Sequence, residues 1–313
     1  MTALLLLLLA WPPAPADSLR PTSPAHRLAC TFANDIFFGI DYYFTQGITL
    51  DWVSPVLARP ANYLLPRGPA GSIRTHGVAL RYDGFTPLDV RDGFIRRGDR
   101  PYAAYFYFSL YRASNQATRR QRLTTALDIG YLGPAAGGKP IQTKLHELTG
   151  YALPRGWDYQ VRSAPVLGYR VAFEKQVLAL GPSAELIGSA EASLGTLYTY
   201  AQGGLRLRAG RFVPYFTDLA PASLVRRWQC YGEATLAVQA VAYDATLQGG
   251  LLTHDNPYVL AASTIRRAVV HGSGGLVVAH GGLSFTATAV FIGPEFAGGL
   301  PHRWGVLGAA KVF

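Results

Sequence analysis

Apolar and polar residues alternate with a period of two along most of this chain. In residues 123–131, Leu123, Leu127 and Ile129 belong to one row of side chains, while small and polar residues fill the other row. The same alternation recurs in three further segments, at residues 169–174, 234–240 and 283–291. Because successive side chains of a strand point to opposite faces, the pattern predicts sheets with one apolar face and one small or polar face.

Segments of this kind predict about twelve strands within one domain. We expect strands near residues 27–35, 45–53, 73–83, 101–112, 121–132, 162–177, 184–192, 198–210, 231–243, 258–270, 276–291 and 304–313. One segment breaks the period, because Ile141, Leu145 and Leu148 are spaced as the apolar stripe of a short helix, with His146 off that stripe. No sequence repeat or linker interrupts the series.

Three features favour a transmembrane β-barrel over a soluble β-sandwich, which would give the same alternation. The segments are about ten residues long, which is the length that a tilted membrane-spanning strand needs. Aromatic residues crowd the strand ends at residues 42–44 and 105–108, where the aromatic girdles of a barrel would lie. The chain also ends in Phe313, and a terminal aromatic residue is typical of bacterial outer-membrane barrels. The predicted fold class is all-β: an antiparallel transmembrane barrel of about twelve strands with a short helix on its extracellular side.

The N-terminal segment predicts export from the cytoplasm. Residues 3–11 form an unbroken apolar run, and Ala14-Pro15-Ala16 resembles a signal-peptide cleavage site. We therefore expect a signal peptide at residues 1–16 and a mature barrel at residues 17–313. A transmembrane helix needs about 20 apolar residues. Neither this run nor any later segment is that long, because charged, Gly or Pro residues interrupt each one.

The composition is poor in charge and rich in arginine. Charged residues make up 15% of the chain, against about 25% in a typical soluble domain. The formal net charge is +10, with 25 Arg and 4 Lys. A guanidinium group suits bidentate contact with phosphate, so anionic lipid headgroups are a natural partner, although a GC-rich genome would give the same bias. Nucleic acid is not expected as a partner of an exported protein. Cys30 and Cys230 are free to pair in an oxidising compartment, and the sequence leaves their pairing open.

The polar clusters fall on one predicted rim of the barrel. In an even-stranded barrel with a periplasmic N-terminus, the connections from odd to even strands face outside the cell. Asn34 and Asp35 flank the first such connection. Arg100 closes the second, and His146 lies within the third. We therefore expect these side chains at the extracellular end. The connection over residues 54–72 is long for a periplasmic turn, so a miscounted strand is the alternative.

Four blocks of these residues stand in a fixed order along the chain. They are Asn34-Asp35; then Asp41, Tyr43, Thr45 and Gly47; then Asp99-Arg100-Pro101-Tyr102-Ala103; and then His146 with Gly156-Trp157-Asp158-Tyr159-Gln160. The ordered blocks resemble the outer-membrane lipid A 3'-O-deacylases, most closely over residues 30–175. The resemblance implies a twelve-stranded barrel in the bacterial outer membrane. It also implies an esterase that removes a 3'-linked acyl chain from the lipid A of lipopolysaccharide, with calcium as cofactor and the protein as a monomer.

The resemblance also implies roles for the catalytic residues. His146 would be the general base that activates water. Asn34, Asp35 and Thr45 would build the metal-binding and oxyanion side of the site, with Asp35 and Asn34 as calcium ligands. One point needs a structural answer, because adjacent Asn34 and Asp35 would point to opposite faces of a regular strand. A bulge at the strand end, or a site at the barrel rim, would resolve it.

Three further residues are candidates for substrate binding. Arg100 stands where the family places a basic residue, and would meet a substrate phosphate; a surface salt bridge is the alternative. Trp157 and Gln160 would contact the substrate, although Trp157 could equally be an interfacial anchor. The chain departs from the family at Ala33, where many relatives carry an acid, and at Gln46, where Asn is more usual. The first change leaves one fewer oxygen ligand if that acid is used.

The residue types suit this chemistry, and two other functions stay open. Imidazole titrates near neutral pH, as a general base for ester hydrolysis should. Calcium prefers carboxylate, amide and carbonyl oxygens. The chain has no G-x-S-x-G motif and no histidines at zinc-ligand spacing, which argues against a serine esterase or a zinc enzyme. The alternatives are a non-enzymatic barrel, either a pore or a structural protein, and a hydrolase of the phospholipase type.

Overall fold

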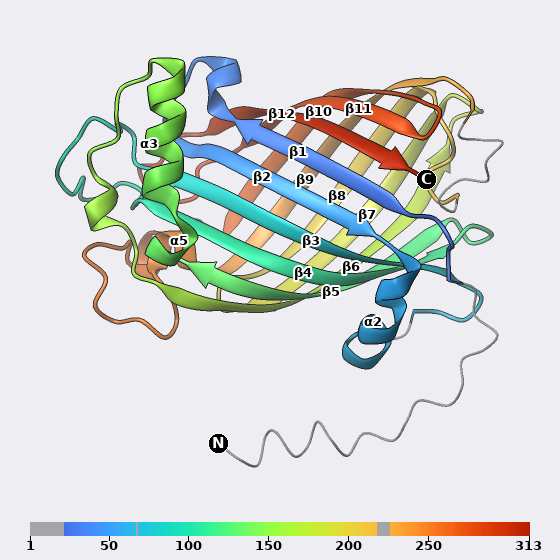
Figure 1. The fold of residues 1–313 in the computed structure, drawn as a ribbon, viewed down its shortest axis with the longest axis horizontal. Helices are drawn as coiled ribbons and strands as arrows, with labels where there is room; N and C mark the ends of the chain where they lie inside the picture. Colours follow the sequence, from blue (N-terminus) through green and yellow to red (C-terminus); the bar gives the residue numbers. More distant parts are fainter. Residues whose placement is uncertain (1–21, 67, 218–225) are drawn as a thin grey trace, which may run out of the picture.

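The twelve strands close into an antiparallel barrel. The computed structural model describes residues 22–66, 68–217 and 226–313. Each strand pairs with its neighbours in the sequence, and β1 pairs with β12 to close the sheet. Figure 1 shows the strands running obliquely along the barrel. The expected signal peptide at residues 1–16 lies outside the described residues.

The strands carry short helices in their connections. The strands are β1 (Arg27–Asn34), β2 (Tyr43–Val53), β3 (Ile73–Thr86), β4 (Ala103–Gln116), β5 (Gln121–Leu132), β6 (Ala164–Ala179), β7 (Ala184–Gly195), β8 (Tyr198–Arg211), β9 (Gln229–Asp244), β10 (Ala268–His280), β11 (Leu283–Ile292) and β12 (His302–Val312). The helices are α2 (Ala58–Leu64), α3 (Gly138–Thr149) and α5 (Ala245–Gln248), and the 3-10 turns are η1 (Asp35–Phe38), η2 (Pro55–Leu57), η3 (Pro134–Ala136), η4 (Trp157–Tyr159) and η5 (Ala262–Thr264). Within the described residues, no helix has the length and apolar character needed to cross a membrane.

The predicted strands match the observed ones except at the tenth and eleventh positions. The predicted strand at 258–270 is mostly connection, and β10 begins at Ala268. The predicted strand at 276–291 covers a hairpin whose turn is Gly281-Gly282, with φ of +58° and +77°. Two glycines at positive φ form a tight two-residue hairpin turn, so the two strands are separated by only two residues and the outward row changes from even to odd positions across them. The connection before β10 is apolar for another reason: Leu260 and Ile265 are buried in a cluster of loop side chains.

Arginine–carboxylate pairs line the inside of the barrel. Arg81 pairs with Asp83 at 2.7 Å, and the same separation joins Arg170 and Asp128. The Arg170 guanidinium donates to both Asp128 oxygens, which uses its planar fork in the bidentate way that lysine cannot. Part of the arginine excess is therefore used inside the lumen, where each cation meets a carboxylate. Outward-facing residues such as Leu205 are apolar and exposed.

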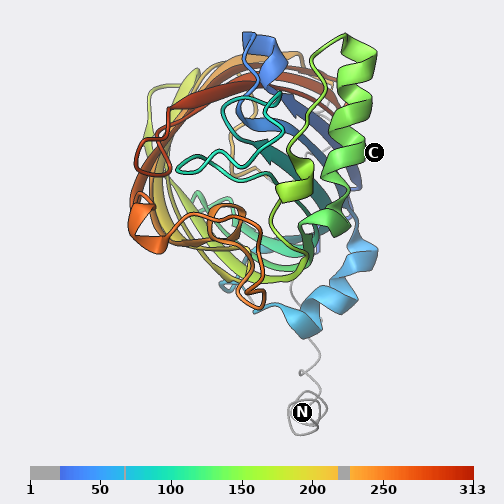
Figure 2. The ribbon, with the colours of Figure 1, turned by 90° about the vertical axis from the view of Figure 1, so that its left-hand side faces the viewer.

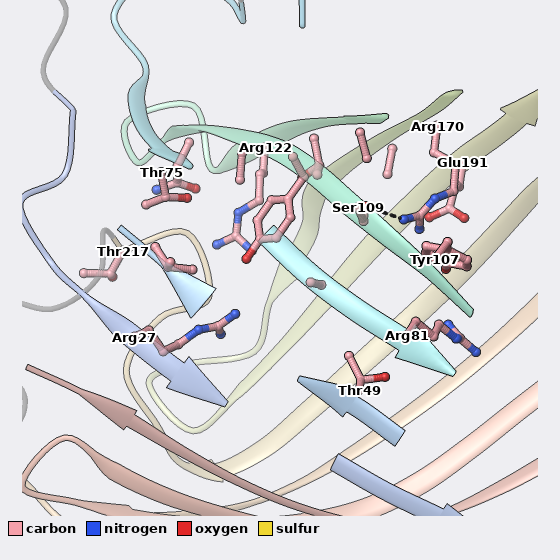
Figure 3. A pocket seen from close by; sticks show the side chains of 18 residues that line it. Arg27, Thr49, Thr75, Arg81, Tyr107, Ser109, Arg122, Arg170, Glu191 and Thr217 are labelled. Atoms are coloured by element: carbon pink, nitrogen blue, oxygen red, sulfur yellow. Dashed lines mark hydrogen bonds between the residues drawn. The ribbon is translucent and has the colours of Figure 1, made fainter. Parts of the chain in front are cut away.

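Two cavities occupy the lumen. One has a volume of about 440 Å³, and the Arg170 guanidinium beside it donates to the Ser109 hydroxyl at 3.1 Å (Figure 3). The other has a volume of about 370 Å³, and four residues line both: Arg81, Tyr107, Arg170 and Glu191. None of the predicted site residues lines either cavity. The site must therefore be sought outside the lumen.

The two ends of the barrel differ in their connections. α3, η1 and α5 all lie at one end, and the C-terminus lies at the other (Figure 1). Because bacterial barrels have longer extracellular loops and shorter periplasmic turns, the α3 end is the extracellular one. Cys30 of β1 and Cys230 of β9 are both exposed and both free, so the pairing that the sequence left open does not form.

Candidate active site

α3 lies against the outside of the barrel wall at its extracellular end. Both views show it across the ends of the first strands, outside the barrel (Figures 1 and 2). A Cβ atom on Gly138 would lie 2.7 Å from the Ala104 Cβ and 2.5 Å from the Trp157 ring, so the helix begins in close contact with β4. Further along, Gln142 reaches Thr45 of β2. The predicted helix is therefore confirmed, and it forms one side of a site whose other side is the strand wall.

The amphipathic character of α3 is inverted relative to a helix on a soluble protein. Gln142 and His146 face the barrel and are buried. The apolar stripe faces away, with Ile141 41% and Leu148 74% exposed. Residues four apart lie on one face of a helix, so the polar pair forms a single buried edge opposite the strands.

Gln142 is the central contact between α3 and the wall, and the sequence analysis did not identify it. The Trp157 indole N–H donates to Gln142 Oε1 at 2.6 Å. The Gln142 amide then donates to the Thr45 hydroxyl at 3.1 Å. Trp157 is itself buried against Tyr102, with ring centroids 4.9 Å apart, so it is not an interfacial anchor. A polar residue four positions before His146 was the signal that could have revealed Gln142.

A β-bulge aims Thr45 at α3. Phe44 pairs with Phe85 and Gln46 pairs with Gly84, so Thr45 is the extra residue between them. Phe44 points into the lumen, where it stacks on Trp304. The extra residue interrupts the alternation of faces. Thr45 and Gln46 therefore both lie on the outer side, where the Gln46 amide donates to the Tyr82 hydroxyl at 3.1 Å.

A turn at the end of β1 places Asn34 and Asp35 in the same region. β1 ends at Asn34 and η1 begins at Asp35, so the two residues do not follow a regular strand. Asn34 caps this turn, because its Oδ1 accepts the backbone N–H of Ile36 at 2.8 Å. The turn fits because Gly305 of β12 leaves space for Phe37. The parity problem is thus resolved by a site at the rim, with no bulge in β1.

The carboxyl group of Asp35 is buried next to a second carboxyl group. Burial raises the pKa of Asp35 to about 9, and the negative charge of Asp41 acts in the same direction. Backbone N–H groups of Tyr42 and Ile36 oppose this shift but do not cancel it. Burial also raises the pKa of Asp41, while the nearby His146 lowers it. The sequence analysis gave Asp41 no role. In the structure, its charge interacts with those of both Asp35 and His146.

Three buried oxygens of this site lack a hydrogen-bond partner among the described residues: Asp35 Oδ2, Asp41 Oδ1 and Gln46 Oε1. Oxygen atoms of this kind are the ligands that calcium prefers. The described part of the chain has no cluster of three His, Cys, Asp or Glu side chains suited to a metal ion. A cation here would therefore be held by carboxylates together with amide and carbonyl oxygens, a donor set that fits calcium better than a transition metal.

His146 is held by the turn that follows its helix. Gly150 adopts the left-handed conformation with φ of +74°, and it ends α3 while Tyr151 N donates to the His146 carbonyl at 3.0 Å. This reversal brings the carbonyl oxygen of Ala152 to 2.6 Å from His146 Nδ1. A carbonyl oxygen can only accept, so Nδ1 carries the proton and Nε2 keeps its lone pair. The imidazole is thus fixed in the tautomer that a general base requires.

Arg100 and Gln160 take no part in the hydrogen bonds that join α3 to the strand wall. The Arg100 guanidinium is fully buried, pairs with Glu295 at 2.5 Å and donates to Thr246 at 2.8 Å. It also lies over the Phe85 ring at 4.2 Å. Arg100 therefore links the connections that contain Thr246 and Glu295 at the extracellular end of the barrel. Its contact with a substrate phosphate stays a prediction. Gln160 is buried at the end of η4, and its Oε1 has no hydrogen-bond partner among the described residues.

Comparisons with known proteins agree with this fold. A family model described as outer membrane protein LpxR matches residues 1–313. The solved structure of LpxR from Salmonella typhimurium has a TM-score of 0.73 at 20% identity, over 92% of this chain and 100% of that one. The β-domain of the Bordetella autotransporter BrkA has a TM-score of 0.47 at 14% identity, over 93% of this chain and 100% of that one. No curated protein sequence matches the chain.

Proposed function

Since the chain belongs to the LpxR family of outer-membrane proteins, we propose that it is a lipid A deacylase that hydrolyses a 3'-linked acyl ester. The observation that carries the proposal is the geometry of His146. Its Nδ1 is committed to the Ala152 carbonyl, which leaves Nε2 as the ring atom that can accept a proton, on a side chain buried on the face of α3 that lies against the strand wall. The acidic residues of the opposite wall, Asp35 and Asp41, complete a site suited to water activation.

His146 acts as the general base. With Nδ1 donating to a backbone oxygen, Nε2 can take a proton from a water molecule as that water attacks the ester carbonyl. The carbonyl contact also prevents the ring from rotating, so the lone pair keeps its direction. Asp41 lies close enough for its charge to interact with His146, and a negative charge there stabilises the imidazolium that forms when the proton arrives.

Asp35 and Asp41, with amide oxygens of Gln46 and Asn34, would hold calcium. When bound there, calcium would stabilise the negative charge that develops on the ester carbonyl oxygen. The unpartnered oxygens of Asp35, Asp41 and Gln46 support this assignment. Ala33 packs against the aromatic cluster of the lumen side. An acid at that position would therefore face away from the cleft, so this departure from the family removes no ligand on the outer side.

Four residues position this machinery: Thr45, Gln142, Trp157 and Gln160. Thr45 and Trp157 bind the two ends of the Gln142 amide and so fix the distance between α3 and the wall. We assign Trp157 and Gln160 a structural role beneath α3, since both are buried. Thr45 keeps an oxygen at the cleft, where it would meet the scissile ester or the attacking water.

The direct test is the mass of the lipid product. The purified barrel is incubated in detergent with lipid A and calcium, and the lipid is analysed by mass spectrometry. We expect the loss of one 3'-linked acyl chain with the wild-type protein, and little or no loss with His146→Ala or Asp35→Asn. Glu147→Gln is the matched control, because Glu147 is exposed on the same helix.

Unchanged lipid A with folded wild-type protein would refute the proposal. Release of fatty acid from a glycerophospholipid in place of lipid A would support the phospholipase alternative instead. Full activity in His146→Ala would leave the reaction intact but remove His146 as its base.

A further inference from the structure

The connections at the two ends of the barrel differ in their charge. At the α3 end, acidic and basic residues are mixed, and several form ion pairs such as Arg96–Asp92 and Lys139–Asp158. At the opposite end, the connections span residues 54–72, 117–120, 180–183, 212–228 and 281–282. Apart from position 218, which lies outside the described residues, these connections contain no Asp or Glu.

Six exposed cations surround that end, and we call them the basic rim. They are Arg59, Arg119, Arg120, Lys175, Arg211 and Lys311. None of them forms an ion pair with a residue that the structure describes; Arg120 donates to the Gln176 side-chain oxygen and Lys311 to the Gly281 carbonyl, both neutral acceptors. The carboxylates of the nearby strands point into the lumen, where Glu185 pairs with Arg208. Among the described residues, no ion pair therefore neutralises the charge of the basic rim.

The basic rim stands at the edge of the apolar surface of the barrel. Lys175 lies in the outward row of β6 between the exposed Phe173 and Val177, and Lys311 lies in the row of β12 between Leu307 and the terminal Phe313. Arg211 ends the outward row of β8. Cations within the last few positions of rows of lipid-facing side chains can reach the boundary between hydrocarbon and headgroups.

We propose that the basic rim binds the phosphate groups of anionic phospholipids in the leaflet that faces the periplasm. This end carries the C-terminus and lies opposite the α3 end with its long loops (Figure 1). It is therefore the periplasmic end. Anionic headgroups attract juxtamembrane Lys and Arg, and within the described part of the chain no Asp or Glu forms an ion pair with a cation of the basic rim. The inference is independent of the proposed esterase activity, because it concerns the opposite end of the barrel.

The test compares two lipids for contact with the reconstituted barrel. Spin-labelled phosphatidylglycerol and phosphatidylcholine are added to phosphatidylcholine vesicles that contain the protein, and the immobilised fraction of each is measured by electron paramagnetic resonance. We expect the wild-type barrel to prefer phosphatidylglycerol at low salt and to lose the preference as salt rises. The triple variant Lys175→Gln/Arg211→Gln/Lys311→Gln should lose at least about half of that preference.

Two matched variants make the result specific. Lys175→Arg/Arg211→Lys/Lys311→Arg keeps the charge and should keep the preference. Arg97→Gln/Arg266→Gln removes exposed cations at the α3 end, and should reduce the preference less. An unaltered preference in the neutral rim variant, or a larger loss in the α3-end variant, would overturn the proposal. Circular dichroism shows in each case that the barrel is folded, and none of these measurements depends on lipid A turnover.

Discussion

Replacing Gln142 with methionine would break both hydrogen bonds that join α3 to the barrel wall. Methionine has a similar length, but it offers Trp157 only a weak thioether acceptor and Thr45 no donor. Both partners are buried, so water cannot easily take the place of the lost amide. A buried polar group left unpaired costs about 1–3 kcal/mol, so two such groups give an expected loss of about 2–6 kcal/mol. Because the strand ladder does not depend on Gln142, the loss should fall on the local stability of α3.

Hydrogen exchange measures this local stability directly. A loss of about 2–6 kcal/mol corresponds to a fall of roughly 30- to 25,000-fold in the protection of α3 amides that exchange by local opening. Peptides from β7 to β9 lie outside the region and serve as an internal reference. Glu147→Met is the matched control, because it changes an exposed residue of the same helix.

The reasoning would be refuted if Gln142→Met left the protection of α3 within about threefold of the wild type. A loss of lipid A turnover with unchanged protection would show instead that Gln142 takes part in the chemistry and does not merely position α3. A parallel fall of protection and turnover would support the positioning role.

Three further predictions follow from the same contacts. Gly305→Ala would place a Cβ 2.7 Å from the Phe37 ring, so η1 must shift and lipid A turnover should fall at least about tenfold. Gly274→Ala is the control, because open space surrounds Gly274, and it should not change turnover. The raised pKa of Asp35, about 9, means that its carboxyl holds a proton at pH 7 until a cation binds. Calorimetry in two buffers should therefore detect release of about one proton per calcium. Calcium affinity should fall about tenfold for each pH unit below 9. Arg100→Met leaves Glu295 without its cation and should lower the free energy of unfolding by about 3–5 kcal/mol. The double variant Arg100→Met/Glu295→Leu should restore much of that loss. Unchanged stability with a raised KM would favour a phosphate contact for Arg100 instead.

The strands were largely predictable, because a barrel repeats one simple rule. Each strand has lipid on one side and a narrow lumen on the other, so the alternation of side chains is visible in the sequence. The alternation misplaced the predicted strands at 258–270 and 276–291, where a connection and a hairpin turn have similar sequence patterns. Gly281-Gly282 turns the chain within two residues, so two alternating strands lie almost without a gap in the sequence, and the connection before β10 is apolar because it packs on other loops.

The site was predictable in its residue types but not in its supports. His146 and Asp35 were recognisable because charged and titratable residues are scarce in this chain. The bulge at Thr45 adds one residue to a strand pairing, and a pairing register cannot be seen in one strand alone. The partner of Arg100 was equally hidden, since Glu295 lies 195 positions away in the chain.

The orientation of α3 illustrates why a correct helix prediction can still misplace its faces. The spacing of Ile141, Leu145 and Leu148 normally marks the buried side of a surface helix, because water surrounds a soluble protein. Here the outer surface of the barrel adjoins lipid, and the strand wall under the helix presents Thr45 and other polar groups. The stable arrangement is therefore the reverse one, with the apolar stripe outward and Gln142 against the wall. The same reversal turns His146 into the cleft, so the position of the proposed base depends on the membrane as much as on the sequence of the helix.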